Sequence, residues 1–316
     1  MPRFNSIIFV YILFVSALSA QVKDVGLPFV TNYSRDDYNA GTQNWSIAED
    51  DNGYMYFANN NGVLRFDGFN WDIFKLPNGS LVRSLKYSDG KLFVGGYEEF
   101  GYFEYTNHGS FEYHSLSDKF ADVGEGVGEV WCIYDTKYGA VFQSFSAIIL
   151  YTNNRIYNIA PKSSFSFSFF VDQNFYVVDR QYGLYVLQGK ELSEIFLHNT
   201  FFNENEVKFM FSAPDNGYLL GTIDKGVFKY DGLQLIPWNA EVNKILRDDQ
   251  IYTAIELDED LIAIGTIQNG LLILNKEGEV LQHINRYKGL QNNTILSLHL
   301  DSNGNLWMGL DNGIDF

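Results

Sequence analysis

The same pattern of apolar runs and glycine turns is written seven times along this chain of 316 residues. In the last copy, Leu296 to Ile314, alternating apolar residues lead to an Asn-Gly turn, a second apolar run ends in Asn-Gly, and a third run follows at once. The earliest copy is Trp45 to Val63 and the fifth is Lys208 to Val227. Asx-Gly between alternating apolar runs is a strong hairpin signal. Each copy therefore predicts strand, turn, strand, turn, strand.

The glycine that closes the second turn sets the period of the repeat. It stands at Gly62, Gly101, Gly183, Gly226, Gly270 and Gly313, with Ala147 in the third place, at intervals of 39, 46, 36, 43, 44 and 43 residues. A further turn signal in most periods adds a fourth strand. This spacing is typical of a propeller blade, whereas a two-sheet sandwich would not repeat its turn chemistry at one period.

The fold prediction is therefore all-β, a seven-bladed β-propeller of four-stranded antiparallel blades. The expected blades are residues 44–79, 80–120, 128–161, 164–197, 206–239, 250–287 and 294–316. The seventh has only three strands, and we expect a strand near residues 28–33, within a lead-in at 21–43, to complete it and close the ring. Pro28 suits an outermost strand, which has a free edge. No segment longer than a turn or two shows a helical period, and the best candidate, residues 115–123, lies in a connection.

The composition excludes several kinds of partner. Thirty-nine acidic residues against 22 basic ones give a net charge of −17, which repels nucleic acid and anionic membrane surfaces. Cys132 is the only cysteine, so an intramolecular disulfide and a thiolate metal cluster are both impossible. We expect it to be a buried, inert thiol.

The first twenty residues predict export. Met1 to Ser6 carries one arginine and no acid, Ile7 to Leu18 is almost wholly apolar, and Ala20 precedes Gln21, as in a cleaved signal peptide. An uncleaved anchor is the weaker interpretation because the apolar run is short for a bilayer. The mature segment is expected to be periplasmic and to reach the membrane only through a region beyond Phe316.

The sequence predicts no catalytic residue, metal or cofactor. Its five histidines lack metal-ligand spacing, and no HExxH, GxSxG or Walker loop occurs. The adjacent Glu98 and Glu99 could act as acid and base, but such a pair is more often a solvated loop. Asp301 to Trp307 looks like the Asp-containing turn of sialidases, although its Asp lies three rather than two residues before the Gly. The acidic turns at residues 49–52 and 258–260 suit calcium, with turn formation the favoured interpretation.

Binding is expected on one face of the ring. The loops joining strands two and three lie on the same face as the connections between blades, around the mouth of the central channel, where propellers usually bind. Aromatic planes beside amides and carboxylates would suit a sugar, whose CH face stacks while its hydroxyls form hydrogen bonds. The candidate ligand-binding residues are Trp45, Asn59, Asn60, Glu98, Glu99, Trp131, Arg180, Gln181, Asp224, Gln268, Asn269 and Asp311.

Residues 41–71, together with NGNLWMGLDNGID at 303–315, resemble the two-component regulator propeller repeats of extracytoplasmic sensors in Bacteroidetes-type bacteria. Repeats two to four depart from the pattern. The resemblance implies that this chain is the N-terminal fragment of a longer receptor, with a triple-tyrosine β-sandwich, a membrane helix and either a hybrid histidine kinase or a LuxR-type DNA-binding domain. The NYS and NWSI runs look most like the triple-tyrosine, LuxR-type branch.

Three functions remain open at this point. The first is a periplasmic sensor for a small-molecule or oligosaccharide ligand, in a receptor that regulates transcription. The second is a secreted propeller enzyme acting on glycans. The third is an interaction scaffold that mediates dimerisation, and a homodimer is also one expectation for the full receptor.

Overall fold

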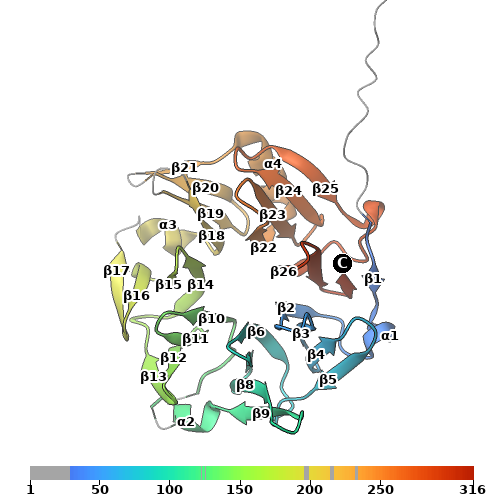
Figure 1. The fold of residues 1–316 in the computed structure, drawn as a ribbon. Helices are drawn as coiled ribbons and strands as arrows, with labels where there is room; N and C mark the ends of the chain where they lie inside the picture. The colour runs from blue at the N-terminus through green and yellow to red at the C-terminus, as the bar shows by residue number, and fades with distance from the viewer. Residues whose placement is uncertain (1–28, 122, 125, 196–198, 214–216, 232–233) are drawn as a thin grey trace, which may run out of the picture.

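The computed structural model describes residues 29–121, 123–124, 126–195, 199–213, 217–231 and 234–316, and these residues form a ring of seven sheets around a central opening (Figure 1). Each sheet has four antiparallel strands, and the chain runs outward from the channel in each of the first six. The predicted all-β, seven-bladed propeller is therefore confirmed. The expected signal peptide, residues 1–20, lies outside the described residues.

The strands of the seven blades have the following bounds. Blade 1 contains β2 (Asn44–Glu49), β3 (Met55–Asn59), β4 (Gly62–Phe66) and β5 (Trp71–Phe74). Blade 2 contains β6 (Val82–Ser88), β7 (Lys91–Gly96), β8 (Phe100–Tyr105) and β9 (Phe111–Ser115). Blade 3 contains β10 (Cys132–Thr136), β11 (Gly139–Gln143), β12 (Ile148–Thr152) and β13 (Arg155–Ile159). Blade 4 contains β14 (Phe165–Val171), β15 (Asn174–Asp179), β16 (Gly183–Gln188) and β17 (Glu191–Ile195).

The remaining blades follow the same order. Blade 5 contains β18 (Val207–Ala213), β19 (Gly217–Thr222), β20 (Gly226–Tyr230) and β21 (Leu235–Pro237). Blade 6 contains β22 (Ile251–Glu256), β23 (Leu261–Thr266), β24 (Leu271–Asn275) and β25 (Val280–Ile284). Blade 7 contains β26 (Ile295–Leu300), β27 (Leu306–Leu310), β28 (Ile314–Asp315) and, as its outermost strand, β1 (Asn32–Tyr33).

The two ends of the chain close the ring, as expected. Strand β1 pairs antiparallel with β28, with Asn32 opposite Asp315. Two backbone hydrogen bonds between Thr31 and Phe316, of 2.7 and 2.9 Å, extend this pairing. The Tyr33 ring packs over Trp307 of the same blade, with 6.1 Å between ring centroids. Residue 28, at the start of the expected strand, lies outside the described residues.

Helices occur only in the connections between blades among the described residues. They are α1 (Arg35–Tyr38), α2 (Ser117–Ala121), α3 (Asn199–Glu204), α4 (Ala240–Asp249) and the 3₁₀ helix η2 (Arg286–Lys288). The helix expected within residues 115–123 is present as α2. The expectation of nothing longer than two turns was wrong, because α4 has ten residues. No helix in the described part of the chain is both long and apolar enough to cross a membrane.

Helix α4 forms because its N-cap is strong and one side of it is buried. The Asn239 side chain accepts hydrogen bonds from the backbone N–H groups of Glu241 and Val242. Val242 and Leu246, one turn apart, are both buried against blades 5 and 6. Val242 and Leu246 are the only buried apolar residues of this helix, and two residues are too few for a helical hydrophobic period to be recognised in the sequence.

The core consists of clusters in which the sheets face one another. Second strands are buried on both faces, as Tyr56, Phe57 and Ala58 of β3 illustrate, because each blade packs against two neighbours. Polar side chains are buried at the end of these strands, where they close the next turn. Thr266, for example, donates to Gly270 O at 2.9 Å and accepts from Asn269 N at 3.0 Å. We call Asn59, Ser144, Asp179, Thr222 and Thr266 the turn-closing residues.

Candidate functional site

A ring of seven side chains lines the central channel, one from the start of each innermost strand. In six blades a β-bulge interrupts the pairing of the innermost strand at this point. In blade 3 the equivalent residue, Trp131, immediately precedes β10 and donates its backbone N–H to Gln143 O. Bulges re-aim side chains and are common beside functional sites. The channel ring comprises Trp45, Arg83, Trp131, Phe167, Lys208, Tyr252 and Leu296, which all line one cavity of about 260 Å³.

Arg83 lies between two tryptophans of this ring. Its guanidinium carbon is 3.9 Å from the Trp45 ring centre and 4.9 Å from that of Trp131. The Glu129 carboxylate accepts from Arg83 Nε at 3.2 Å and Nη2 at 3.1 Å. Arg83 Nη1 has no hydrogen-bond partner among the described residues. The guanidinium is therefore fixed in plane, and its Nη1 is a buried donor without a partner in the described part of the chain.

Lys208 has the same arrangement farther around the ring. Its Nζ lies 4.3 Å from the Phe167 ring centre and 4.9 Å from that of Tyr252, and it pairs with Glu206 at 2.5 Å. The lysine side chain is only 8% exposed. Burial raises the pKa of Tyr252 to about 12, so its phenol stays neutral near pH 7. The channel ring thus presents two cations that are each held between aromatic rings and balanced by a carboxylate.

Small residues after the ring positions bind neighbouring blades together. Ser84 Oγ donates to Val130 O of the next blade at 2.7 Å, and Ser297 Oγ donates to Asn44 O at 3.0 Å. These bonds join the innermost strands directly behind the ring side chains. The ring side chains are therefore held in place by these serine-to-backbone hydrogen bonds as well as by side-chain packing.

The structure brings together four of the residues predicted from the sequence. Trp45 and Trp131 belong to the channel ring. Asn60 Oδ1 accepts from Trp45 Nε1 at 2.8 Å, and its amide donates to Gln43, which in turn donates to Asp311 at 2.6 Å. These polar groups extend the site from Trp45 over the adjoining loops.

Three other predicted ligand-binding residues form hydrogen bonds within the fold, and two of them are buried. Asn59 is a turn-closing residue with no exposed surface and donates to Gly41 O and Asn44 Oδ1. Glu99 is buried and accepts from the hydroxyls of Tyr113 and Ser115. Glu98 is exposed but accepts from two backbone N–H groups of residues 127 and 128, so its carboxylate holds that loop.

The other five predicted residues are dispersed over loops of blades 4 to 6. Arg180 lies over the Phe145 ring at 5.3 Å, close to Trp131, and Gln181 occupies the same exposed loop. Asp224 pairs with Lys225. Gln268 and Asn269 contact Gln250 and Asp249 near the end of α4. Among the described residues that line the channel cavity, none of these five appears.

Five channel-ring residues were not predicted, although the sequence contains a signal for most of them. In five blades the ring residue follows a buried Val or Ile at or just before the start of the innermost strand, as in Val82-Arg83, Val207-Lys208 and Ile251-Tyr252. Aligning the seven repeats at this dipeptide would have identified the ring. The missed residues are Arg83, Phe167, Lys208, Tyr252 and Leu296.

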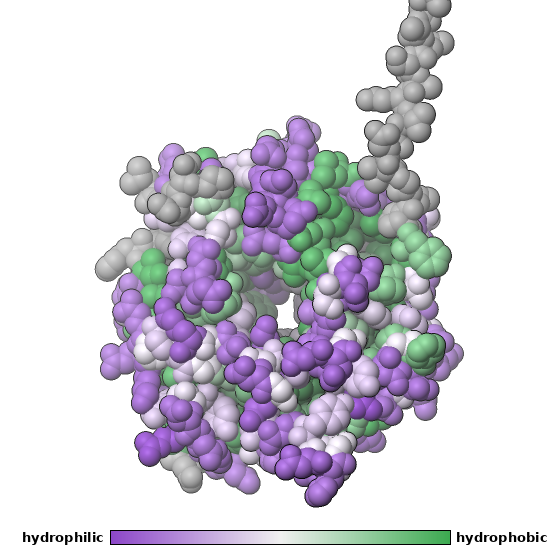
Figure 2. Space-filling model, viewed as in Figure 1, coloured by the Kyte–Doolittle hydropathy of each residue, from purple (hydrophilic) through white to green (hydrophobic). Residues whose placement is uncertain are grey.

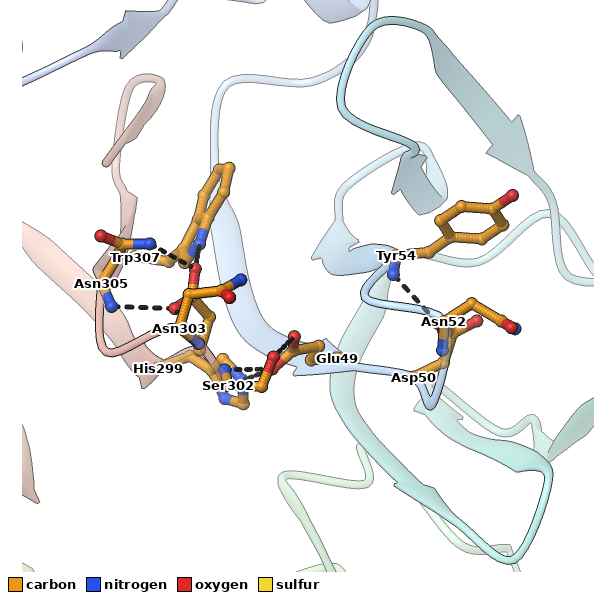
Figure 3. Close-up of polar contacts among 10 residues, drawn as sticks. Glu49, Asp50, Asn52, Tyr54, His299, Ser302, Asn303, Asn305 and Trp307 are labelled. Atoms are coloured by element: carbon orange, nitrogen blue, oxygen red, sulfur yellow. Dashed lines mark hydrogen bonds and ion pairs between the residues drawn. The ribbon is translucent and has the colours of Figure 1, made fainter.

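The strand order places the acidic turns on the opposite face. Figure 3 shows the hydrogen bonds of the turns at Asp50 and Ser302. Asp50 accepts from Asn52 N and Tyr54 N, and Glu49 joins blade 1 to Ser302 of blade 7. Asp301, which looked like a sialidase turn, accepts from Trp307 Nε1 at 3.0 Å and from Asn305 N. No cluster of three or more His, Cys, Asp or Glu suited to a metal occurs within the described ranges.

Asp179 should make stability depend on pH. Burial alone would raise the pKa of its carboxyl, but hydrogen bonds from Ser163, Gln181 and Tyr182 outweigh this and hold the pKa below its usual value. A depressed folded-state pKa adds stability above the unfolded pKa of about 3.9, and this is lost as the pH falls through the folded pKa. Asp179→Asn is therefore expected to cost about 2 kcal/mol at pH 7 and clearly less at pH 3 in urea unfolding.

Asp224→Asn is the control for this experiment, because Asp224 occupies the corresponding turn of blade 5 but is exposed. It is expected to change stability by less than about 0.5 kcal/mol at both pH values. An Asp179→Asn deficit that is the same at pH 7 and pH 3 would contradict the role given to the carboxylate.

Comparisons with known proteins fit this architecture. Residues 289–312 match a family model described as "Two component regulator propeller", which confirms the resemblance seen in the repeats. A streptogramin B lyase structure aligns over 91% of this chain and 96% of its own, at 13% identity and a TM-score of 0.70. No curated protein matches the chain by sequence.

Two extracellular domains from B. thetaiotaomicron are similar as well. The extracellular domain of a protein named as a hybrid two component system aligns over 92% of this chain and 42% of its own, at 16% identity and a TM-score of 0.67. That of a protein named as a one component system aligns over 90% and 39%, also at 16% and 0.67. At such low identities the structural alignments establish a shared fold and nothing more. This chain spans less than half of either ectodomain.

Proposed function

We propose that this chain is the ligand-sensing propeller of an exported, membrane-spanning regulator and that the channel ring binds an oligosaccharide. The match at residues 289–312 and the fold shared with two sensor ectodomains support the sensor role. Export and a periplasmic position are part of the same proposal. The receptor's output, a histidine kinase or a LuxR-type DNA-binding domain, would lie outside this segment.

The observation that carries the proposal is the partly exposed stack of Trp45, Arg83 and Trp131 at the channel. Indole edges and faces favour the CH surface of a sugar ring, and the Arg83 guanidinium is held rigidly between the two indoles. Charged groups are costly in a confined channel unless they are paired, as Arg83 is with Glu129. A rigid, paired and aromatic-flanked donor set is what binding a polyhydroxylated ligand requires.

Binding without cleavage is the proposed activity. The carboxylates that might have served as an acid and base pair, Glu98 and Glu99, are engaged in the hydrogen bonds of a loop and of β9 respectively. Signalling then requires that the ligand bind one receptor conformation more tightly than another. We place the ligand-dependent contacts at the channel ring, which joins all seven blades.

A thermal-shift screen tests this function. The chain from residue 21 would be screened against linear neutral oligosaccharides of glucose, galactose, mannose, xylose and arabinose, with product analysis of every hit. A ligand at 100 times its Kd stabilises the folded state by about 2.7 kcal/mol. Stabilisation without cleavage supports the proposal. Cleavage would make the protein an enzyme, and no shift with any sugar would refute oligosaccharide sensing.

Variants locate the binding in the channel. Trp45→Ala is expected to weaken binding of a stabilising sugar by about tenfold or more, which is the loss of one aromatic contact worth about 1.4 kcal/mol. Trp238→Ala is the matched control, because Trp238 is also half-buried but packs beside α4 in blade 5. Equal weakening by both variants would argue against the channel ring as the binding site.

A further inference from the structure

A second cavity, of about 640 Å³, lies next to the channel ring. We call it the groove. Its walls come from loops of blades 2 to 4 on the face where the blade connections run. Figure 2 shows that this ring of blades surrounds an opening at its centre. The groove is lined by Tyr97, Trp131, Phe145, Ser146, Ser163 and Ser164, a mixture of aromatic faces and hydroxyls.

Both walls of the groove are fixed by carboxylates. Glu98 accepts from Val127 N at 3.0 Å and from Gly128 N at 2.9 Å, which holds the wall on the side of blades 2 and 3. Asp179 accepts from the backbone N–H groups of Lys162 and Ser163 at 2.9 and 3.0 Å, which holds the wall beside blade 4. Because the loops of the groove are already ordered before binding, little entropy is lost in ordering them when a ligand binds.

The groove and the channel share their dividing wall. Trp131 lines both cavities. Glu129 of the groove forms its ion pair with Arg83 of the channel ring, and Phe145 of the groove packs edge-on against Phe167 of the ring, with 5.8 Å between ring centroids. A ligand that reaches over Trp131 would therefore contact both cavities without crossing a separate structural element.

We propose that the channel ring and the groove are two parts of one site, which binds an uncharged, elongated, polyhydroxylated chain with one end in the channel. The proposal rests on the function proposed above. The ligand is uncharged because both ring cations are already balanced, by Glu129 and Glu206. We expect an end of the ligand to enter the channel. The ring is closed by the pairing of β1 with blade 7, so the middle of a long polymer cannot enter the channel from the side.

Titration calorimetry tests this with glucose, galactose, mannose, xylose and arabinose, with their linear trimers, and with the corresponding polysaccharides as competitors. The trimer of the bound sugar is expected to bind at least about tenfold more tightly than the monomer, since it alone reaches the groove. At equal mass concentration, the polysaccharide should compete about tenfold less well than the trimer, because it contains far fewer chain ends.

Tyr97→Ala separates the two parts of the site. Tyr97 is 53% exposed, so its removal should leave the fold intact. The variant is expected to weaken trimer binding about tenfold and to leave monomer binding unchanged, whereas Trp45→Ala weakens both. Tyr287→Ala, at a 97% exposed tyrosine between blades 6 and 7, is the control and should change neither.

The outcomes distinguish this inference from the function on which it rests. Equal affinity for monomer and trimer, unchanged trimer binding by Tyr97→Ala, or a polysaccharide that competes as well as the trimer would overturn the two-part site while leaving an oligosaccharide sensor in place. If none of these sugars bound the protein, both proposals would be wrong.

Discussion

Replacing Asp315 by alanine is expected to lower the free energy of unfolding by about 3–5 kcal/mol, because it removes the shared acceptor of three partly buried hydrogen bonds at the point where the ring closes. Asp315 has no exposed surface. Its carboxylate accepts from Asn32 of β1 at 2.8 Å and from the backbone and side-chain nitrogens of Gln291 at 2.9 and 2.7 Å. Urea unfolding of the purified protein measures the loss.

Two further variants show whether this loss comes from the closure. Burial raises the pKa of Asp315 even though its hydrogen bonds oppose the rise, so the charge itself is not the stabilising feature. Asp315→Asn, which keeps the shape and one oxygen acceptor, should therefore cost less than the alanine variant. Asp36→Ala, at an exposed position of α1, should change stability by less than about 0.5 kcal/mol. A similar small effect of Asp315→Ala would mean that β1 does not hold the ring together.

The fold could be predicted because it depends on turns that use the same chemistry in each blade. A hairpin turn needs a residue that tolerates positive φ, and Gly or Asn supplies it, as at Gly53, Asn153 and Gly304. Helix α4 was missed because it depends on tertiary burial of two residues, Val242 and Leu246, and on one cap. A turn signal that recurs in successive blades can be recognised in the sequence, whereas a helix that depends on one packing contact cannot.

The candidate site was harder to predict because its side chains come from strands and not from loops. Loop polarity pointed to Asn59 and Glu99, but buried hydrogen bonds at strand ends also need polar side chains, and these two residues serve that purpose. Arg83 and Lys208 face the channel only because a β-bulge turns them there. Strand alternation alone does not show a bulge, so the buried Val or Ile before the ring residue is the main sequence signal for these positions.

Gly270→Ala is expected to cost about 3–5 kcal/mol, which is more than the strain of a positive φ alone. Gly270 has φ +87°, and a Cβ added there would lie 2.2 Å from the carbonyl oxygen of Ile284 in β25. Strand β25 would have to move away from β24, which breaks the outermost pairing of blade 6. Urea unfolding of the variant beside the parent protein measures this cost.

Gly304→Ala is the matched control, because Gly304 has φ +82° but nothing lies within 4 Å of its added Cβ. Its cost should be only about 1 kcal/mol, and equal costs for the two variants would show that strain, not contact, explains the glycine. The same contact recurs at Gly62, whose added Cβ would meet Phe74 O at 2.4 Å, and at Gly101, which would meet His114 O at 2.1 Å. The third strand approaches the outer strand closely in each of these blades, so a side chain larger than that of glycine would collide there. That is why the glycine marks the period of the repeat in the sequence, whereas the residue type of the channel ring differs from blade to blade.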